Sequence, residues 1–194
     1  MTKKPKGVRG YTNRRVNTRD MRPRFLVVCE GEQTEPNYFR RFARPWVTVN
    51  VLGLGVGPIR LVERAANEAR KPEHKGSRVW CVFDRDEVKA EQFNKAYELA
   101  QRKGFAVAYS NPAFELWLLL HFQECRAPLS SRREYIERLS QHLPRPYEKS
   151  DRRMFDRLEA LQPAAIRRAA ELLSTYEPCS PCHDDPSTTV HRCV

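Results

Sequence analysis

The chain has 194 residues, enough for one well-buried domain but few for two independent hydrophobic cores. It contains no run of eighteen apolar residues, and no apolar stretch follows the charges at its amino terminus, so we expect a cytoplasmic protein rather than a membrane or secreted one. Its 35 Lys and Arg outnumber its 24 Asp and Glu and give a formal net charge of +11, which favours a polyanionic partner.

Most of this excess charge lies in the first 24 residues. The segment holds nine basic side chains against the single acid Asp20, and it has too few apolar residues to offset the entropy of ordering. We predict a flexible basic arm over residues 1–24 that contacts the phosphates of a nucleic acid with little sequence information. A solvated tail that binds nothing is the alternative. The residues that we assign to the phosphate contact are Arg14, Arg15, Arg19, Arg22 and Arg24.

Four short apolar runs follow, separated by segments with helical patterns. Strands are predicted for these runs, which lie at 25–30, 46–52, 78–84 and 105–109. The first run has no polar alternation, as expected for a strand covered on both faces. Helices are predicted between them, at 34–44, 58–69 and 90–103. Short strands that alternate with helices predict an α/β fold with a mainly parallel four-stranded sheet between helices. In such a sheet the ligand sits at the carboxyl ends of the strands.

The chain beyond the fourth strand has helical patterns only. Helices are predicted at 112–122, which is apolar on almost every side and therefore buried, and at 132–142, 151–161 and 163–176. The predicted organisation is the arm at 1–24, an α/β core at 25–125, and a helical C-terminal extension and tail at 126–194. Cys29, Cys81 and Cys125 lie in apolar or helical surroundings and are expected to be reduced, buried thiols.

Three acidic residues stand at the ends of predicted strands. Glu30 ends the first strand, Asp84 ends the third, and Asp86 follows two residues later. Because side chains alternate along an extended chain, Asp84 and Asp86 project to one side while Arg85 points away. Clustered carboxylates repel one another unless a cation neutralises them, and oxygen ligands favour a hard cation. We therefore predict that Glu30, Asp84 and Asp86 bind Mg²⁺ or Mn²⁺; a Glu30 that merely pairs with an arginine is the alternative.

Two further glutamates begin predicted helices. Glu35 lies in a first turn, where it either stabilises the helix dipole or completes the site, and the sequence leaves both roles open. Glu115 follows Asn111 and Pro112, which are predicted to cap and begin a very apolar helix. A carboxylate on such a helix is expected to face the site rather than solvent. The candidate catalytic residues are thus Glu30, Glu35, Asp84, Asp86 and Glu115.

Other motifs are interpreted structurally. His121 is predicted to be a hydrogen-bonded core histidine rather than a base. The glycines at 53, 55 and 57 lack the spacing of a nucleotide-binding loop and predict a turn. Four residues offer a chelating spacing for zinc, but we do not predict zinc at this set, which comprises Cys179, Cys182, His191 and Cys193.

Several of these motifs resemble a known family. The segments at 28–35 and 82–87 resemble the Glu and Asp-x-Asp signatures of a Toprim domain. Four separated motifs in the same order further resemble the RloB family over nearly the whole chain apart from the arm, and they lie at 25–39, 83–87, 111–122 and 186–190. The resemblance implies a Toprim-like (Rossmannoid) nuclease fold, found beside restriction-modification or other phage-defence genes and often with a companion ATPase.

The resemblance also assigns residues. It places the family's glutamate on Glu30, its second acidic position on Glu35, and its aspartate pair on Asp84 and Asp86. Arg85 between the aspartates departs from a typical Toprim pattern. The extra domains that topoisomerases and primases require are not in this sequence, so neither activity is expected.

The prediction for function is a Mg²⁺- or Mn²⁺-dependent nuclease that hydrolyses phosphodiester bonds of DNA or RNA, with water as the nucleophile, in an anti-phage or restriction-associated system. Arg85 and Lys89 would join the arm in binding phosphates. Two alternatives stay open: a nucleic-acid-binding regulatory subunit of an ATPase-containing complex, without independent catalysis, and a nucleotidyl or phosphoryl transferase on the same metal site. The sequence also leaves a homo-oligomer open.

Overall fold

A computed structural model describes residues 22–86 and 88–194. The arm residues Arg14, Arg15 and Arg19, for which a phosphate contact is predicted, lie outside the described residues. In the part of the chain that the structure describes, every helix is too short or too polar to span a lipid bilayer.

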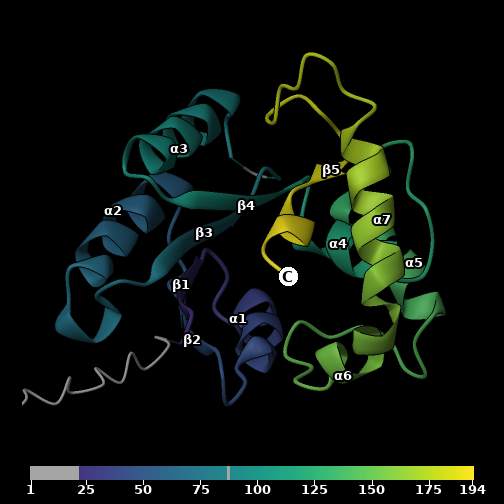
Figure 1. Cartoon of the computed structure of the whole chain (residues 1–194). Helices are drawn as coiled ribbons and strands as arrows, with labels where there is room; N and C mark the ends of the chain where they lie inside the picture. The colour runs from purple at the N-terminus through teal and green to yellow at the C-terminus, as the bar shows by residue number, and fades with distance from the viewer. Residues whose placement is uncertain (1–21, 87) are drawn as a thin grey trace, which may run out of the picture.

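A five-stranded, mostly parallel sheet forms the centre of the molecule (Figure 1). All four predicted strands are present and pair in parallel, and a fifth strand that was not predicted pairs antiparallel with the fourth. The order across the sheet is β2-β1-β3-β4-β5. The strands are β1 (Arg24–Cys29), β2 (Thr48–Gly53), β3 (Arg78–Asp84), β4 (Ala106–Asn111) and β5 (Ser187–Thr188).

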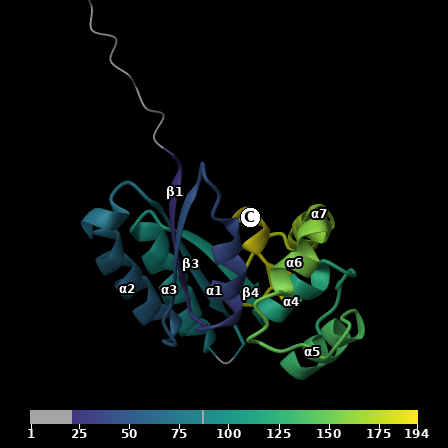
Figure 2. The same cartoon turned by 90° about the horizontal axis from the view of Figure 1, so that it is seen from below.

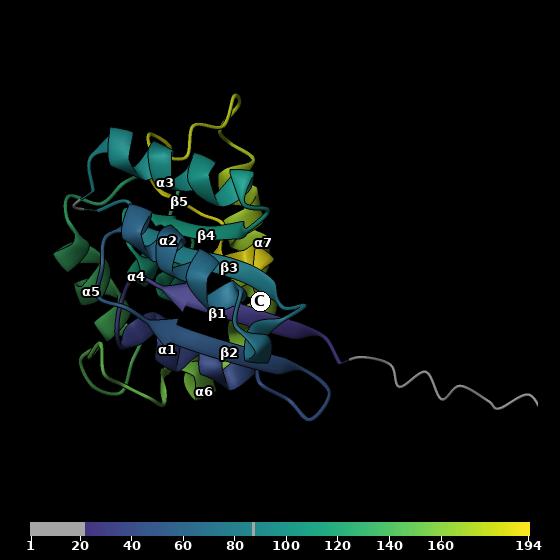
Figure 3. The same ribbon diagram turned by 90° about the vertical axis from the view of Figure 1, so that its left-hand side faces the viewer.

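Helices cover both faces of this sheet, as Figure 2 and Figure 3 show. One face carries α2 (Pro58–Ala69) and α3 (Ala90–Arg102). The other face carries α1 (Thr34–Phe39), α4 (Phe114–Leu120) and α7 (Gln162–Leu173). The predicted arrangement of a sheet between helices is therefore confirmed.

Strand β1 shows how the sequence fills these two layers. Its side chains alternate, so Leu26 and Val28 belong to the core beneath α2 and α3, whereas Val27 and Cys29 belong to the core beneath α1 and α4. All four side chains are at most 2 % exposed. A strand that is buried on both faces needs the unbroken apolar run that the sequence provides.

The order of the strands creates a crevice beside β1. From β1 the chain moves through α1 to β2 on one side, and from β2 it crosses back through α2 to β3 on the other side of β1. The connections that leave β1 and β3 lie on opposite faces of the sheet. The carboxyl ends of β1 and β3 thus flank a topological switch point, where doubly wound sheets bind their ligands.

The later part of the chain packs against the second face. Helices α5 (Arg132–Gln141) and α6 (Met154–Leu158) follow α4, and the chain then returns through α7 to β5. All seven residues of α4 are buried, in agreement with its apolar composition. The carboxyl-terminal residues lie against the sheet between α1 and α7 (Figure 1), and Val190 is fully buried there.

Two predicted boundaries around β2 are wrong. The helix predicted to reach residue 44 ends at Phe39 and continues as a 3₁₀ turn at Arg40–Phe42. The strand predicted from residue 46 begins at Thr48, because Arg44 and Val47 pair with each other and close a turn around Trp46. Trp46 is 65 % exposed at this turn.

Asn111 does not cap α4, which corrects a second expectation. It is the last residue of β4 and pairs with Ser187, and its side-chain amide donates a hydrogen bond to the Asp184 carbonyl at 3.0 Å. Helix α4 begins at Phe114, with Ala113 in the cap position. The helices predicted at 151–161 and 163–176 are also shorter, since a 3₁₀ turn separates α6 from α7.

Candidate functional site

A cleft of about 660 Å³ opens at the switch point between β1 and β3. Four of the five predicted catalytic carboxylates line it, and the fifth, Glu115, lies behind its wall in contact with the cleft residue Arg132. The structure thus brings all five together from separate segments of the chain. The residues that line the cleft are Glu30, Gly31, Glu32, Gln33, Thr34, Glu35, Gly55, Asp84, Asp86, Val88, Arg132 and Lys149.

The loop after β1 supplies the first pair of carboxylates. Glu30 follows the last strand residue, and its Oε2 accepts a hydrogen bond from the backbone amide of Asp84 at 3.1 Å. Glu35, in the first turn of α1, accepts a weaker bond from the Gly31 amide at 3.3 Å. A Cβ atom at Gly31 would lie 2.6 Å from Glu35 Oε1, so only glycine allows the loop and this carboxylate to approach so closely.

The end of β3 supplies the second pair. Asp84 is the last strand residue, and Asp86 is held in the following turn because its amide donates to the Pro112 carbonyl at 2.9 Å. Both carboxylates point toward the guanidinium of Arg132, which lies 3.8 Å from Asp84 and 3.3 Å from Asp86. The predicted alternation of side chains is confirmed, since Arg85 turns away and donates to the Cys182 carbonyl at 3.1 Å.

Glu115 reaches the same guanidinium from α4. Its side chain is fully buried, and Oε1 accepts a hydrogen bond from Arg132 Nη2 at 3.1 Å. The second oxygen lies 2.8 Å from the same nitrogen as an ion pair without hydrogen-bond alignment. Tyr147 adds a long hydrogen bond to Oε1 at 3.4 Å. Glu115 therefore contacts the cleft residue Arg132 from behind, and the reasoning from an Asn111 cap was wrong.

Burial raises the pKa values of three carboxylates, Glu30, Glu35 and Asp84, and neighbouring negative charges add to the effect. Burial, and to a smaller extent the charge of Glu35, raises the pKa of Glu30 to about 7, against the hydrogen bond from the Asp84 amide. Burial and then the charges of Glu35 and Glu115 raise the pKa of Asp84, although Arg132 lowers it. Burial and the charge of Glu115 likewise raise the pKa of Glu35. The charge of Arg132 lowers the pKa of all three carboxylates but does not outweigh burial.

The chemistry of this donor set suits a hard divalent cation, because every candidate ligand is a carboxylate oxygen. Within residues 22–86 and 88–194, however, no three Asp, Glu, His or Cys side chains already surround one point as metal ligands. The guanidinium of Arg132 stands between Asp84, Asp86 and Glu115 instead. A cation bound by Asp84 and Asp86 therefore requires these side chains to turn and Arg132 to withdraw.

The predicted phosphate-binding residues that the structure describes are not among those that line the cleft. Arg24 begins β1 at the opposite edge of the sheet and donates to the Glu73 and Lys75 carbonyls, and Arg22 is exposed next to it. Lys89 is exposed just before α3. The guanidinium of Arg85 is occupied by the carbonyls of Cys182 and Val88. Phosphate binding by these residues stays a prediction.

The remaining predicted motifs have structural roles or separate positions. His121 is 1 % exposed, and its Nδ1 lies 3.0 Å from the Trp117 carbonyl, so the predicted core histidine is confirmed. Cys29, Cys81 and Cys125 are free and buried, as expected. Of the residues considered for zinc, Cys182 packs against the core beneath α2 and α3, while Cys193 packs against the core on the other face of the sheet.

The sequence analysis missed several residues of the site, and Arg132, Tyr147 and Lys149 are the ones that come from the chain beyond α4. Arg132 is the first residue of α5, Tyr147 donates to Glu115, and Lys149 lines the cleft from the loop before α6, where its carbonyl accepts a hydrogen bond from Thr34 at 3.1 Å. The sequence offered little signal for them, because they follow the sheet by many residues and stand among other basic side chains.

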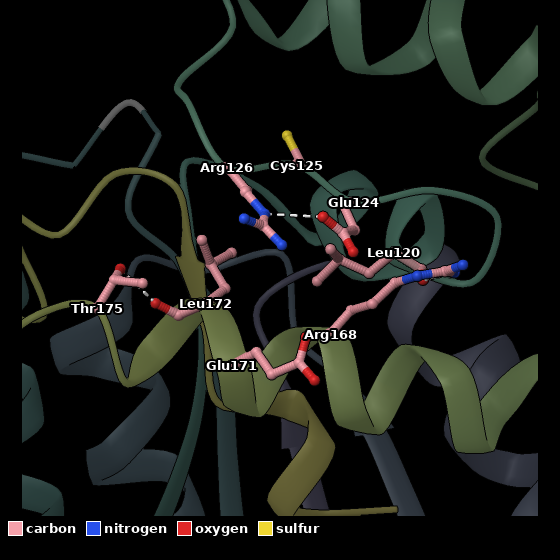
Figure 4. Close-up of a pocket in the computed structure, with 8 residues that line it drawn as sticks. All are labelled: Leu120, Glu124, Cys125, Arg126, Arg168, Glu171, Leu172 and Thr175. Carbon is pink, nitrogen blue, oxygen red and sulfur yellow. Dashed lines mark hydrogen bonds and ion pairs between the residues drawn. The ribbon is translucent and has the colours of Figure 1, made fainter.

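A second hollow, of about 300 Å³, lies between the end of α4 and α7 (Figure 4). Its polar side chains are already used within the chain. Glu124 and Arg126 pair at 2.7 Å, Arg168 donates to the Leu120 and His121 carbonyls, and Thr175 donates to the Leu172 carbonyl. Arg168 thus links α7 to the end of α4, and we assign this hollow a structural role.

The fold and the cleft define a doubly wound α/β protein with an acidic crevice at the carboxyl ends of its parallel strands. The sequence profile of the RloB-like protein family matches residues 25–194, and the chain belongs to this family. The resemblance expected from the four motifs is thus confirmed. Searches of curated proteins and of solved structures found no match to the chain.

Proposed function

We propose that this protein is a metal-dependent nuclease with a Toprim-like fold, which hydrolyses phosphodiester bonds of DNA or RNA. The observation that carries the proposal is the convergence of Glu30, Asp84 and Asp86 on one cleft at the β1–β3 switch point. These are the residues that the Toprim resemblance assigns to a metal. Membership of the RloB-like family supports a cytoplasmic role in an anti-phage or restriction-associated system, with a companion ATPase as partner.

In this proposal Glu30, Asp84 and Asp86 hold Mg²⁺ or Mn²⁺, which when bound polarises the scissile phosphate and favours hydroxide at neutral pH. Glu35 is buried and has a raised pKa, so it suits the role of a base that takes a proton from the attacking water. The water oxygen attacks phosphorus and the bond to the leaving oxygen breaks. Lys149 and Arg132, the cationic side chains among the described lining residues, would contact the phosphate.

The most direct experiment incubates the purified chain with plasmid DNA and with total tRNA, in Mg²⁺, in Mn²⁺ and in EDTA. We expect cleavage of one substrate class that EDTA abolishes, and a loss of about a hundredfold or more in Asp84→Asn. Glu91→Gln is the matched control, because Glu91 is an exposed first-turn acid on α3. Equal cleavage by Asp84→Asn and the unmodified chain would show that another site or a contaminant is responsible.

One observation favours the second candidate function, a regulatory subunit that binds nucleic acid without cleaving it. The carboxylates do not yet surround one point, and Arg132 neutralises part of their charge. The two functions differ in a simple way. A regulatory subunit binds DNA or RNA in the presence of Mg²⁺ or Mn²⁺ but leaves the nucleic acid intact. If cleavage appears after the companion ATPase is added, Asp84→Asn does not reduce it.

A further inference from the structure

Arg132 is the centre of charge in the cleft. A single guanidinium lies within 4 Å of three carboxylates, which come from β3, from the turn after it and from α4. Its side chain is 32 % exposed, whereas Glu115 on its inner side is fully buried. The guanidinium therefore closes the inner wall of the cleft and keeps one edge open to solvent.

A metal ion bound by Asp84 and Asp86 would conflict with this arrangement. Oxygen ligands lie about 2.0–2.1 Å from Mg²⁺, so the cation would stand within a few ångströms of a guanidinium nitrogen that is itself 3.3 Å from Asp86. Two positive charges at such a distance repel strongly in a partly buried site. The same carboxylate oxygens cannot serve both cations with good geometry.

Arg132 is also incompletely satisfied where it stands. Its Nε is buried and has no hydrogen-bond partner among the described residues, and its contact to Asp84 at 3.8 Å is long. The guanidinium has five donors, and a phosphate can accept two of them in parallel. Because Arg132 is the first residue of α5, its stem can turn toward the open cleft without disturbing the helix interior.

We propose that Arg132 exchanges partners during the reaction: it neutralises the carboxylates while the metal is absent, and metal entry displaces it to bind the phosphate of the substrate. This inference rests on the proposed function and assigns a counter-ion and substrate-binding role to a residue of the same site. It has a distinctive consequence. Loss of Arg132 tightens metal binding and weakens nucleic-acid binding, which a purely structural partner of Glu115 would not do.

The test measures both affinities on the full chain. Calorimetry with Mn²⁺ is expected to show that Arg132→Gln binds the ion about tenfold more tightly than the unmodified protein, because a repelling charge is gone. Binding of a short single-stranded oligonucleotide, DNA or RNA, in Ca²⁺ is expected to weaken about tenfold or more in the same variant, and gel analysis confirms that the oligonucleotide stays intact.

Arg133→Gln is the matched control, because Arg133 follows on the same helix, is exposed and, within residues 22–86 and 88–194, pairs with Glu137 alone at 2.8 Å. It should leave the Mn²⁺ affinity unchanged and weaken oligonucleotide binding far less. Arg132→Lys keeps the charge but loses the planar fork, so its Mn²⁺ affinity should stay close to that of the unmodified protein.

The outcomes separate the inference from the proposed function. If the unmodified protein binds Mn²⁺ and Arg132→Gln binds it equally or more weakly, or if oligonucleotide binding is unchanged, the exchange is wrong and the metal site stands. If neither protein binds Mn²⁺, both fail.

If Arg132→Gln does not fold, a measurement on the unmodified chain tests the proposal instead. In an NMR titration, the Nε–H signal of Arg132, assigned by its absence in Arg132→Lys, should shift as Mg²⁺ is added, and its proton should exchange faster with solvent. A signal that does not respond to bound Mg²⁺ would overturn the proposed exchange of partners.

Discussion

Single residues in this protein show how burial controls the charge of a side chain. His121 is enclosed by α4 and by the rings of Trp117 and Tyr38, and its Nδ1 is held at the Trp117 carbonyl. Burial lowers the pKa of His121 to about 4. The neutral ring is therefore part of the folded state, which agrees with a structural rather than a catalytic role.

This shift predicts an acid-sensitive fold. Between pH 6.5 and about 4 the folded chain binds fewer protons at His121 than the unfolded chain, so stability falls as the pH drops through this window. The unfolding free energy falls when the pH is lowered from 7 to 4, and we expect this fall to be smaller by about 2–3 kcal/mol in His121→Gln than in the unmodified chain. Urea unfolding at both pH values measures it, with the exposed His183→Gln as control. An equal acid loss in the His121 variant and the unmodified chain would contradict this account.

At the residue scale the sequence predicted the acids better than their partners. Strand ends and the Asp-x-Asp spacing located Glu30, Asp84 and Asp86, because parallel strands end at a common edge. Arg132 could not be found in this way. Its position depends on how α5 packs after α4, and no periodic pattern in the sequence encodes that approach.

Among the elements, β5 depends most on a distant part of the chain. Its two residues pair with Ser110 and Asn111 at the end of β4. On its other side, Ser110 pairs with Asp84 of β3. Thr188 Oγ1 donates to the Tyr109 carbonyl at 2.9 Å and accepts from the Val190 amide at 3.3 Å. These buried contacts anchor the tail to the sheet beside the cleft.

Thr188→Val keeps the shape of this side chain and removes its hydrogen bonds. We expect the unfolding free energy to fall by about 1–3 kcal/mol, because a buried backbone amide loses its partner. Urea denaturation measures the change. Thr48→Val, at an exposed position at the start of β2, should change stability by no more than a few tenths of that amount. No loss in Thr188→Val would mean that β5 contributes little to the fold.

The four long strands were predictable, and the fifth was not, for one physical reason. A short apolar run of five to seven residues between helical patterns favours a strand, whereas Ser187 and Thr188 form a strand because β4 offers them a free edge. The α4 boundary failed for the same reason. Asn111 has a strong preference for a helix cap, but pairing with the tail extends β4 through this residue.

In the whole molecule, the first described residues and the cleft lie at opposite ends of the parallel strands. The described chain begins beside the amino end of β1, and Glu30 follows its carboxyl end, about 20 Å away for a six-residue strand. A nucleic acid that contacts both would have to extend along the sheet. From its charge alone, the arm is expected to add affinity without taking part in the chemistry.

Deleting residues 1–23 tests this division. We expect the shortened chain to fold, to keep its Mn²⁺ affinity and to bind DNA or RNA more weakly. The slope of log affinity against log salt concentration is negative, and it should become less steep by about 0.9 for each phosphate of duplex DNA that the shortened chain no longer neutralises. Binding isotherms at several salt concentrations measure it. Equal affinity and equal slope in both chains would show that the arm is a solvated tail.

The central claim is that the acids at the ends of β1 and β3 form one divalent-metal site, and metal affinity tests it most directly. Calorimetric titration with Mn²⁺ compares the unmodified chain with Asp84→Ala and Glu30→Ala, and Glu91→Gln serves as the exposed control. We predict a saturable site that weakens at least tenfold in each alanine variant. The thermal stability of Asp84→Ala is expected to stay unchanged or to rise as like-charge repulsion is relieved, whereas Glu30→Ala also removes the hydrogen-bond partner of the Asp84 amide. Unchanged Mn²⁺ affinity in both alanine variants would contradict the site.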